Sequence, residues 1–168
     1  MAEQYLGIDV AERNTTQQHP LGLEVIDPAD PTKHYMYVIT DDTVAVNSAV
    51  FIDTGVGGSG VTAQLPWVIS PTTDLAEAIF GIADTAFAAG EYGFVLIQGE
   101  VTVLAASSLA VDEICVSTAT DGTVDGFIAV TTVDPTKAQL DALHASVRGR
   151  TVICTVAESG GTASVYIY

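Results

Sequence analysis

Basic residues are scarce in this 168-residue chain: five Lys and Arg stand against 21 Asp and Glu, and the formal net charge is −16 at pH 7. A protein that binds nucleic acid directly needs a basic patch that displaces counterions from phosphates, and five scattered bases predict none. Apolar runs of membrane-spanning length are also missing from the sequence. We therefore expect neither nucleic acid nor a membrane as a partner.

Cysteine is equally scarce, because the chain has only Cys115 and Cys154. Two cysteines do not make the disulfide framework of a small secreted protein. Both lie in apolar runs, EICVS and VICTV, where a free thiol behaves as a small buried hydrophobe. No neighbour in the sequence would lower either thiol pKa, so neither is predicted to be catalytic. A single bridge between adjacent strands remains the alternative.

The sequence contains the glycine pattern of a dinucleotide-binding motif but lacks the helix that must follow it. The run GVGGSG at residues 55–60 satisfies G-x-G-x-x-G and follows a predicted strand. That fingerprint requires a helix to begin at the last glycine, whereas the following VTAQL ends at Pro66. We interpret the run as a loop and expect no cofactor.

Metal ligands and catalytic groups are not brought together by the sequence. The three histidines, His19, His34 and His144, are widely spaced and do not predict a zinc site. Asp121 and Asp125 lie in TDGTVDG, which lacks the alternating acidic ligands of a calcium loop and predicts a glycine-rich turn. We expect a protein that is not an enzyme and that holds no metal.

What the sequence does contain is β-structure. In EYGFVLIQGEVTVLA (residues 91–105), alternate side chains from Tyr92 point to one face and those from Gly93 to the other, and both faces are largely apolar. A strand buried on both sides is predicted, with a bulge or tight connection at Gln98-Gly99-Glu100. Further strands are predicted in LGLEVID, HYMYVIT, TVAVNSAVFID, FGIADTAFA, VDEICVST and GFIAVTT, and in TVICTV and ASVYIY, which form a closing hairpin.

Two short helices interrupt this pattern. One is predicted over residues 73–79, where Asp74 and Glu77 have the spacing of a capping box. The other is predicted over residues 135–147, where Pro135 suits the first helical position and an apolar stripe follows. The predicted fold is mainly β: a compact β-sandwich or barrel-like domain with one or two short helices.

An internal similarity bears on the organisation of this domain. Residues 35–46 (YMYVITDDTVAV) align without a gap to residues 92–103 (YGFVLIQGEVTV). Two strand-turn-strand repeats around these segments, or convergence of two unrelated strands on similar side chains, explain the match equally well.

The first 20 residues predict an extended N-terminal arm, with a single β-rich domain over residues 21–168. The arm has no helical period and ends at Pro20. Tyr5, Leu6, Ile8 and Val10 are apolar residues too near the terminus to form a core of their own. We expect these four to contact another protein chain, and packing on the arm's own domain is the alternative.

Taken together, QYLGIDV, YMYVITDDTVAVNSAVFID, FGIADTAFAAGEYGFVLIQGEVTVL, DGFIAV and TASVYIY resemble the small β-rich head proteins of tailed bacteriophages, which include head decoration, or cement, proteins. The resemblance implies a structural virion protein on the outer capsid surface that stabilises the mature shell. Its implied partners are the major capsid protein and further copies of itself in a homotrimer. We expect the four arm residues to contact either a capsid subunit or a neighbouring protomer. A tail or head-completion component, or a small hydrolase, are the alternatives.

Overall fold

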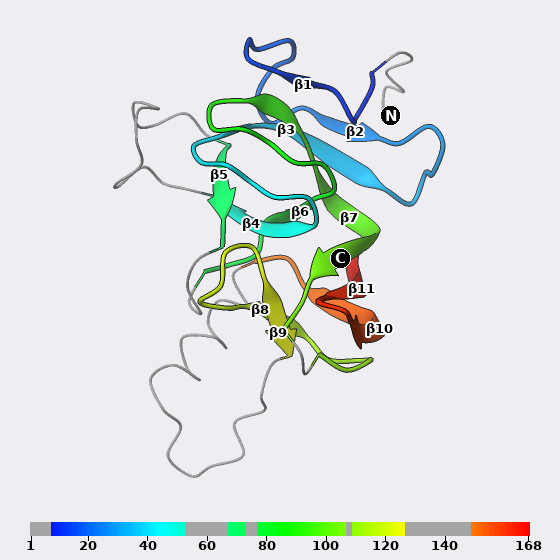
Figure 1. The fold of residues 1–168 in the computed structure, drawn as a ribbon. Helices are drawn as coiled ribbons and strands as arrows, with labels where there is room; N and C mark the ends of the chain where they lie inside the picture. Colours follow the sequence, from blue (N-terminus) through cyan, green and yellow to red (C-terminus); the bar gives the residue numbers. More distant parts are fainter. Residues whose placement is uncertain (1–7, 53–66, 73–76, 107–108, 127–148) are drawn as a thin grey trace.

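The computed structural model describes residues 8–52, 67–72, 77–106, 109–126 and 149–168, and in these ranges all regular structure is β (Figure 1). The prediction of a mainly β, compact domain is confirmed. The strands are β1 (Arg13–Asn14), β2 (Glu24–Ile26), β3 (His34–Thr40), β4 (Ser48–Ile52), β5 (Val68–Pro71), β6 (Gly81–Ala83), β7 (Tyr92–Leu104), β8 (Cys115–Ser117), β9 (Val124–Gly126), β10 (Val152–Ser159) and β11 (Thr162–Ile167).

Five of these strands form a closed barrel. β7 pairs with β3 and β6, β6 pairs with β4, β4 pairs with β5, and β5 returns to β3. The β3–β5 pair is parallel and the other four are antiparallel. Closure satisfies the backbone of these strands internally and leaves few exposed edges. The fold is therefore barrel-like, which is one of the two architectures that the sequence predicted.

β7 separates two hydrophobic cores. Val95 and Ile97 pack inside the barrel. Phe94 and Leu96 pack into a second core on the outer side of the strand, which we call the outer core. All four side chains are buried. The predicted burial of this strand on both faces is confirmed, because the second face is covered by segments from both ends of the chain.

Gly99 is the point at which β7 passes from the barrel to the C-terminal hairpin. Before Gly99 the strand pairs with β3, and from Gly99 to Leu104 it pairs with β11. Gly99 has a φ of 116°, and a Cβ at this position would lie 2.9 Å from the carbonyl oxygen of Thr32. The β3–β7 register also shifts beside it, between His34 and Tyr35. The irregularity predicted at Gln98-Gly99-Glu100 is confirmed, and glycine is needed there.

The two similar segments, residues 35–46 and 92–103, adopt different local forms. The first is β3 followed by a bend, whereas the second lies within one continuous strand, β7. They are neighbours, and Tyr37 lies directly opposite Phe94. The first halves of the two segments share an environment, since residues 35–40 and 93–97 are buried on both faces.

The predicted helices have different outcomes. The helix over residues 135–147 lies outside the described residues, as do residues 73–76 of the other. Residues 77–79 are not helical, which corrects the predicted end of that helix. The carbonyl oxygen of Ile79 accepts a hydrogen bond from Arg150 N, and Phe80 N donates to Val50 O, so distant segments occupy this backbone. The described residues include no helix long and apolar enough to cross a membrane.

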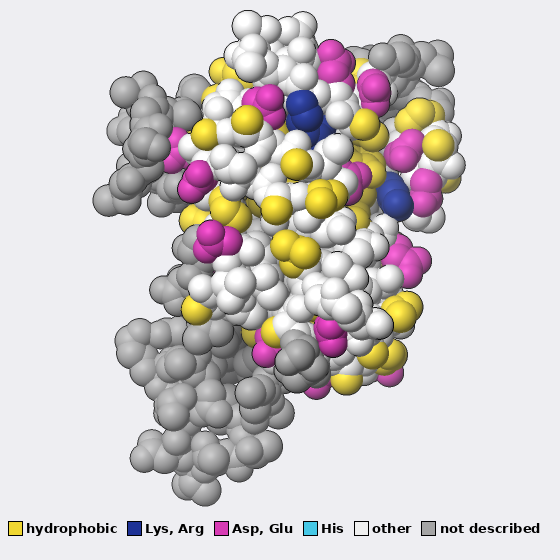
Figure 2. All heavy atoms as spheres, in the orientation of Figure 1, with side chains coloured by type: hydrophobic (Ala, Val, Ile, Leu, Met, Phe, Trp, Pro, Cys, Tyr) yellow, Lys and Arg dark blue, Asp and Glu magenta, His cyan; other side chains and the backbone are white. Residues whose placement is uncertain are grey.

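Acidic side chains are scattered over the visible surface of the described residues, and Lys and Arg are sparse there (Figure 2). This distribution follows from the composition, with 21 acidic and five basic residues in the whole chain. Surface charge of one sign favours solubility and opposes contact with polyanions.

Candidate functional site

The structure places the described part of the predicted arm on the domain itself. Ile8 and Val10 are half-buried and pack against the outer core, while Tyr5 and Leu6 lie outside the described residues. For Ile8 and Val10 the structure therefore shows the alternative that the sequence left open. Contact between the arm and another protein remains a prediction.

β1 attaches this segment to the barrel. Arg13 lies opposite Gly93 and Asn14 opposite Tyr92 in an antiparallel pairing with β7. A Cβ at Gly93 would lie 2.6 Å from Cδ of Arg13 and 2.8 Å from Cε1 of Phe87. Gly93 is thus required for Arg13 to lie directly over the strand.

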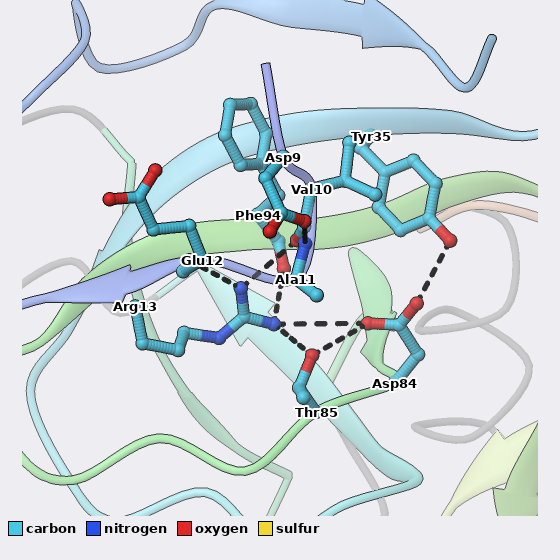
Figure 3. Close-up of polar contacts among 9 residues, drawn as sticks. All are labelled: Asp9, Val10, Ala11, Glu12, Arg13, Tyr35, Asp84, Thr85 and Phe94. Atoms are coloured by element: carbon cyan, nitrogen blue, oxygen red, sulfur yellow. Dashed lines mark hydrogen bonds and ion pairs between the residues drawn. The ribbon is translucent and has the colours of Figure 1, made fainter. Parts of the chain in front are cut away.

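The Arg13 guanidinium is the centre of a polar network (Figure 3). Its side chain is only 11% exposed. Nη1 donates hydrogen bonds to the carbonyl oxygens of Val10 at 3.1 Å and Glu12 at 2.8 Å. Nη2 donates to the carbonyl oxygen of Phe94 at 3.1 Å and to the hydroxyl of Thr85. One side chain therefore links the N-terminal segment to β7 and to the loop after β6.

Asp84 provides the opposite charge. Its Oδ1 lies 3.8 Å from Nη2 of Arg13 and accepts a hydrogen bond from Thr85 Oγ1 at 3.1 Å. Its Oδ2 accepts a hydrogen bond from the hydroxyl of Tyr35 at 2.9 Å. On the other side of the guanidinium, Cζ of Arg13 lies 4.0 Å from the ring centroid of Phe87. We call Arg13, Asp84, Thr85, Tyr35 and Phe87 the Arg13 clamp.

The clamp is charged, and its arginine is largely buried. Burial lowers the pKa of Arg13, and the nearby carboxylates of Asp84, Glu91 and Asp9 oppose this effect. Arg13 remains protonated at neutral pH, because the guanidinium of arginine is not deprotonated in proteins. Burial, followed by the charge of Asp84, raises the pKa of Tyr35, so its hydroxyl stays neutral and donates. This arrangement holds a chain segment in place and presents no free nucleophile or base.

The two described histidines also have structural contacts. The His19 ring packs edge-on against Tyr37 at 5.1 Å, and His34 Nδ1 lies 3.0 Å from a carboxylate oxygen of Glu24. His144 lies outside the described residues. Within the described ranges, no group of three or more His, Cys, Asp or Glu side chains could hold a metal ion.

The cysteines and the glycine-rich turn occupy structural positions. Cys115 and Cys154 are free and buried in the outer core. Burial, aided by the neighbouring Cys154, raises the pKa of Cys115 to about 12, and burial also raises that of Cys154. Both thiols are therefore protonated and unreactive at neutral pH. Residues 121–122 form a turn between β8 and β9 as predicted, but residues 124–126 of the predicted turn are strand β9. The predicted strand GFIAVTT, after its first residue, and residues 55–60 lie outside the described residues.

One polar cleft collects several acids. A hollow of about 410 Å³ is lined by Asp30, Lys33, Asn47, Asp84, Glu100, Val101, Thr102 and Ser164. The carboxylate of Asp30 accepts hydrogen bonds from Thr32, which lower its pKa. Both oxygens of Asp84 are used in the clamp, and Glu100 accepts a hydrogen bond from Thr155. Each carboxylate already has a hydrogen-bond donor from its own domain.

Neither a protein-family model nor a curated protein matches the chain. Among solved structures, the head fiber gp8.5 N base of bacteriophage phi29 is similar in fold, with a TM-score of 0.49 and 15% sequence identity. The similarity covers 80% of this chain and 92% of the phage chain. At this level the likeness concerns the course of the backbone.

The sequence analysis did not predict the clamp. Arg13 is the residue that could have indicated it, because it is one of five basic residues in an acidic chain and lies in the stretch predicted to be an arm. Nothing near it in the sequence identifies Asp84 or Thr85 as partners, since Thr85 lies 72 positions away.

Proposed function

We propose that the protein is a structural component of a tailed-phage virion that binds the outer surface of the capsid and stabilises the mature shell. The observation that carries the proposal is the Arg13 clamp. A largely buried arginine, whose side chain is 11% exposed, fastens a terminal segment to a closed barrel, and this structural role suits a scaffold. The sequence resemblance to head decoration proteins supplies the class.

The surface charge supports an outer location. At −16 the chain has no means of holding packaged DNA, and the same charge favours solubility on the outside of a particle. A shell-stabilising protein needs only modest affinity per copy, because many copies each favour the mature lattice by mass action.

The proposed partners are the major capsid protein and further copies of this chain in a homotrimer. Sedimentation of the free protein and its copy number on intact particles test the assembly. If the number of copies per particle corresponds to the subunits of a single ring, the protein would instead be a head-completion or tail component.

The decisive experiment measures release of packaged DNA on heating. Particles that lack the protein are heated with and without added protein at saturating occupancy, and we expect a higher release temperature with it. Equal release temperatures would exclude stabilisation of the shell. The variant Phe94→Asp, which we expect to prevent folding, provides the control for non-specific protection.

Two truncations separate the arm's possible roles. Removing residues 2–7 deletes Tyr5 and Leu6 and leaves Ile8 and Val10 on the outer core. We expect this change to lower occupancy on particles without altering the free energy of unfolding. Removing residues 2–12 should lower both the occupancy on particles and the free energy of unfolding. Unchanged occupancy after either truncation would show that the arm makes no contact with the particle.

A further inference from the structure

Exposed large apolar side chains concentrate in the C-terminal part of the chain. Of seven such residues among those described, four lie there, namely Val111 (50% exposed), Ile114 (42%), Val156 (56%) and Tyr168 (63%). The others are Ile26, Val46 and Ile52. Exposed apolar side chains that lie next to one another are more informative than single exposed hydrophobic residues.

The strand register gathers apolar side chains on one face. Ile114 lies opposite Ile153, and Ile153 lies opposite Tyr166. Residues directly opposite one another in a sheet project to the same side, so these three form a row across neighbouring strands. The ring of Tyr168 extends the row, with its centroid 4.8 Å from that of Tyr166. We call Ile114, Ile153, Tyr166 and Tyr168 the hairpin face.

The hairpin face is the outer side of these strands. The intervening residues Cys154, Val165 and Ile167 are fully buried in the outer core. Ile153 and Tyr166 are half-buried, and Ile114 and Tyr168 are exposed. The strands therefore have a second apolar side that no described residue of the chain buries.

The border of this face is acidic. The row continues from Tyr166 to Glu100 on β7, and Asp112 and Glu113 immediately precede Ile114. Glu158 lies at the far end of β10. Within the described residues no ion pair joins any of these four acids to a base, because the two that occur are Arg13–Asp84 and His34–Glu24.

Bases are almost absent from this part of the chain. Residues 99–106, 109–126 and 149–168 contain six acids and one base, Arg150. The Arg150 guanidinium lies over the ring of Phe80, with Cζ 5.8 Å from its centroid. These segments therefore supply little positive charge to the border, although Lys33, which lies outside them, lines the same hollow as Glu100.

We propose that the hairpin face is a docking surface for a protein partner whose contact residues are apolar and bordered by Lys or Arg. Burial of the apolar row would drive association, and a basic border would pair with Glu100, Asp112, Glu113 and Glu158. A second copy of this chain is disfavoured as occupant, because a symmetric contact would set the same acids against one another. The inference goes beyond the proposed function, which assigns no surface of the barrel or hairpin.

The test uses the full chain and synthetic peptides as probes. One peptide alternates Lys with Tyr, Ile and Val, a second replaces every Lys with Glu, and a third alternates Lys with Ser. Amide chemical shifts of the isotope-labelled protein locate binding, and titrations at low and high salt give affinities. We expect only the first peptide to perturb the hairpin face, with an affinity that falls as salt rises.

Variants distinguish binding of the peptide at the hairpin face from general attraction of a basic peptide to an acidic protein. The double variant Ile114→Ser/Tyr168→Ser should weaken binding of the first peptide at least ~10-fold. The matched control is Val46→Ser, which removes a side chain of similar exposure (48%) elsewhere and should bind as the wild type does. If the double variant is unstable, Tyr168→Ser alone carries the test, because the Tyr168 side chain is 63% exposed.

The inference would be overturned by equal binding of the Glu peptide, by shifts that map to another surface, or by an unchanged affinity in the folded hairpin variant. Self-association that disappears in the hairpin variant would also overturn it, by making a second copy the occupant. Failure of the protein to bind particles would contradict the capsid role and would leave the peptide result unaffected.

Discussion

Removing the Arg13 side chain tests whether one buried cation fastens the N-terminal segment. Arg13→Ala deletes three hydrogen bonds to the carbonyl oxygens of Val10, Glu12 and Phe94, together with the ion pair to Asp84. Breaking a buried ion pair costs about 3–5 kcal/mol. Asp84 is 29% exposed and keeps its hydrogen bond from Tyr35, so we take the lower end of this range. The free energy of unfolding should fall by about 3 kcal/mol, which lowers Tm by about 6–12 °C for a chain of this size.

Two further variants make this measurement specific. Arg150→Ala removes an arginine whose guanidinium contacts an aromatic ring at 5.8 Å, and it should cost less than about 1 kcal/mol. Arg13→Lys keeps the charge but lacks the planar fork that reaches several acceptors, so an intermediate loss is expected. Urea unfolding gives the three free energies, and amide exchange at Asn14 reports detachment of β1. If Arg13→Ala matches Arg150→Ala in both measurements, the clamp does not hold the segment.

The remaining predictions concern the strand under the clamp and the buried thiols. Phe94→Asp places a carboxylate at a position that is 1% exposed and should cost at least about 4 kcal/mol, and native-like circular dichroism of this variant would contradict the core assignment. Gly93→Ala should cost about 1–3 kcal/mol by overpacking, and less in the Arg13→Ala background; additive losses would show that Arg13 is not the obstacle. Cys115 and Cys154 should resist thiol reagents at neutral pH until the chain unfolds, as a colorimetric thiol assay can show. Because the folded pKa of Cys115 is raised from 9.0 to about 12, its stabilising contribution is present below pH 9.0 and is lost as pH rises toward 12; Cys115→Ala should reduce this loss, and an identical pH profile would refute the shift.

Local patterns located most strands. HYMYVIT coincides with β3, and the closing hairpin of β10 and β11 was predicted from two apolar runs around Gly160-Gly161. These predictions succeed because alternation of side chains and the preferences of turn residues depend on near neighbours in the chain. The helix prediction over residues 73–79 failed at its end, because the backbone there pairs with Val50 and Arg150.

The candidate site depended on contacts that local patterns do not record. The sequence identified Ile8 and Val10 as apolar residues in need of a partner, and the structure provides that partner in the outer core. It could not show that Arg13 would lie over Gly93 or that Asp84 would accept its charge, since these residues meet only when the barrel closes.

The sequence by itself determined that the chain is mainly β and acidic, and that residues 92–97 lie in a strand buried on both faces. These properties follow from composition and from a period of two, which any fold of this chain must accommodate. Only the tertiary structure decided that the sheet closes into a barrel, that the N-terminal segment is clamped to it, and that an apolar row remains outside the hairpin. Each of these depends on strand order and register, which are set by the summed packing of distant segments.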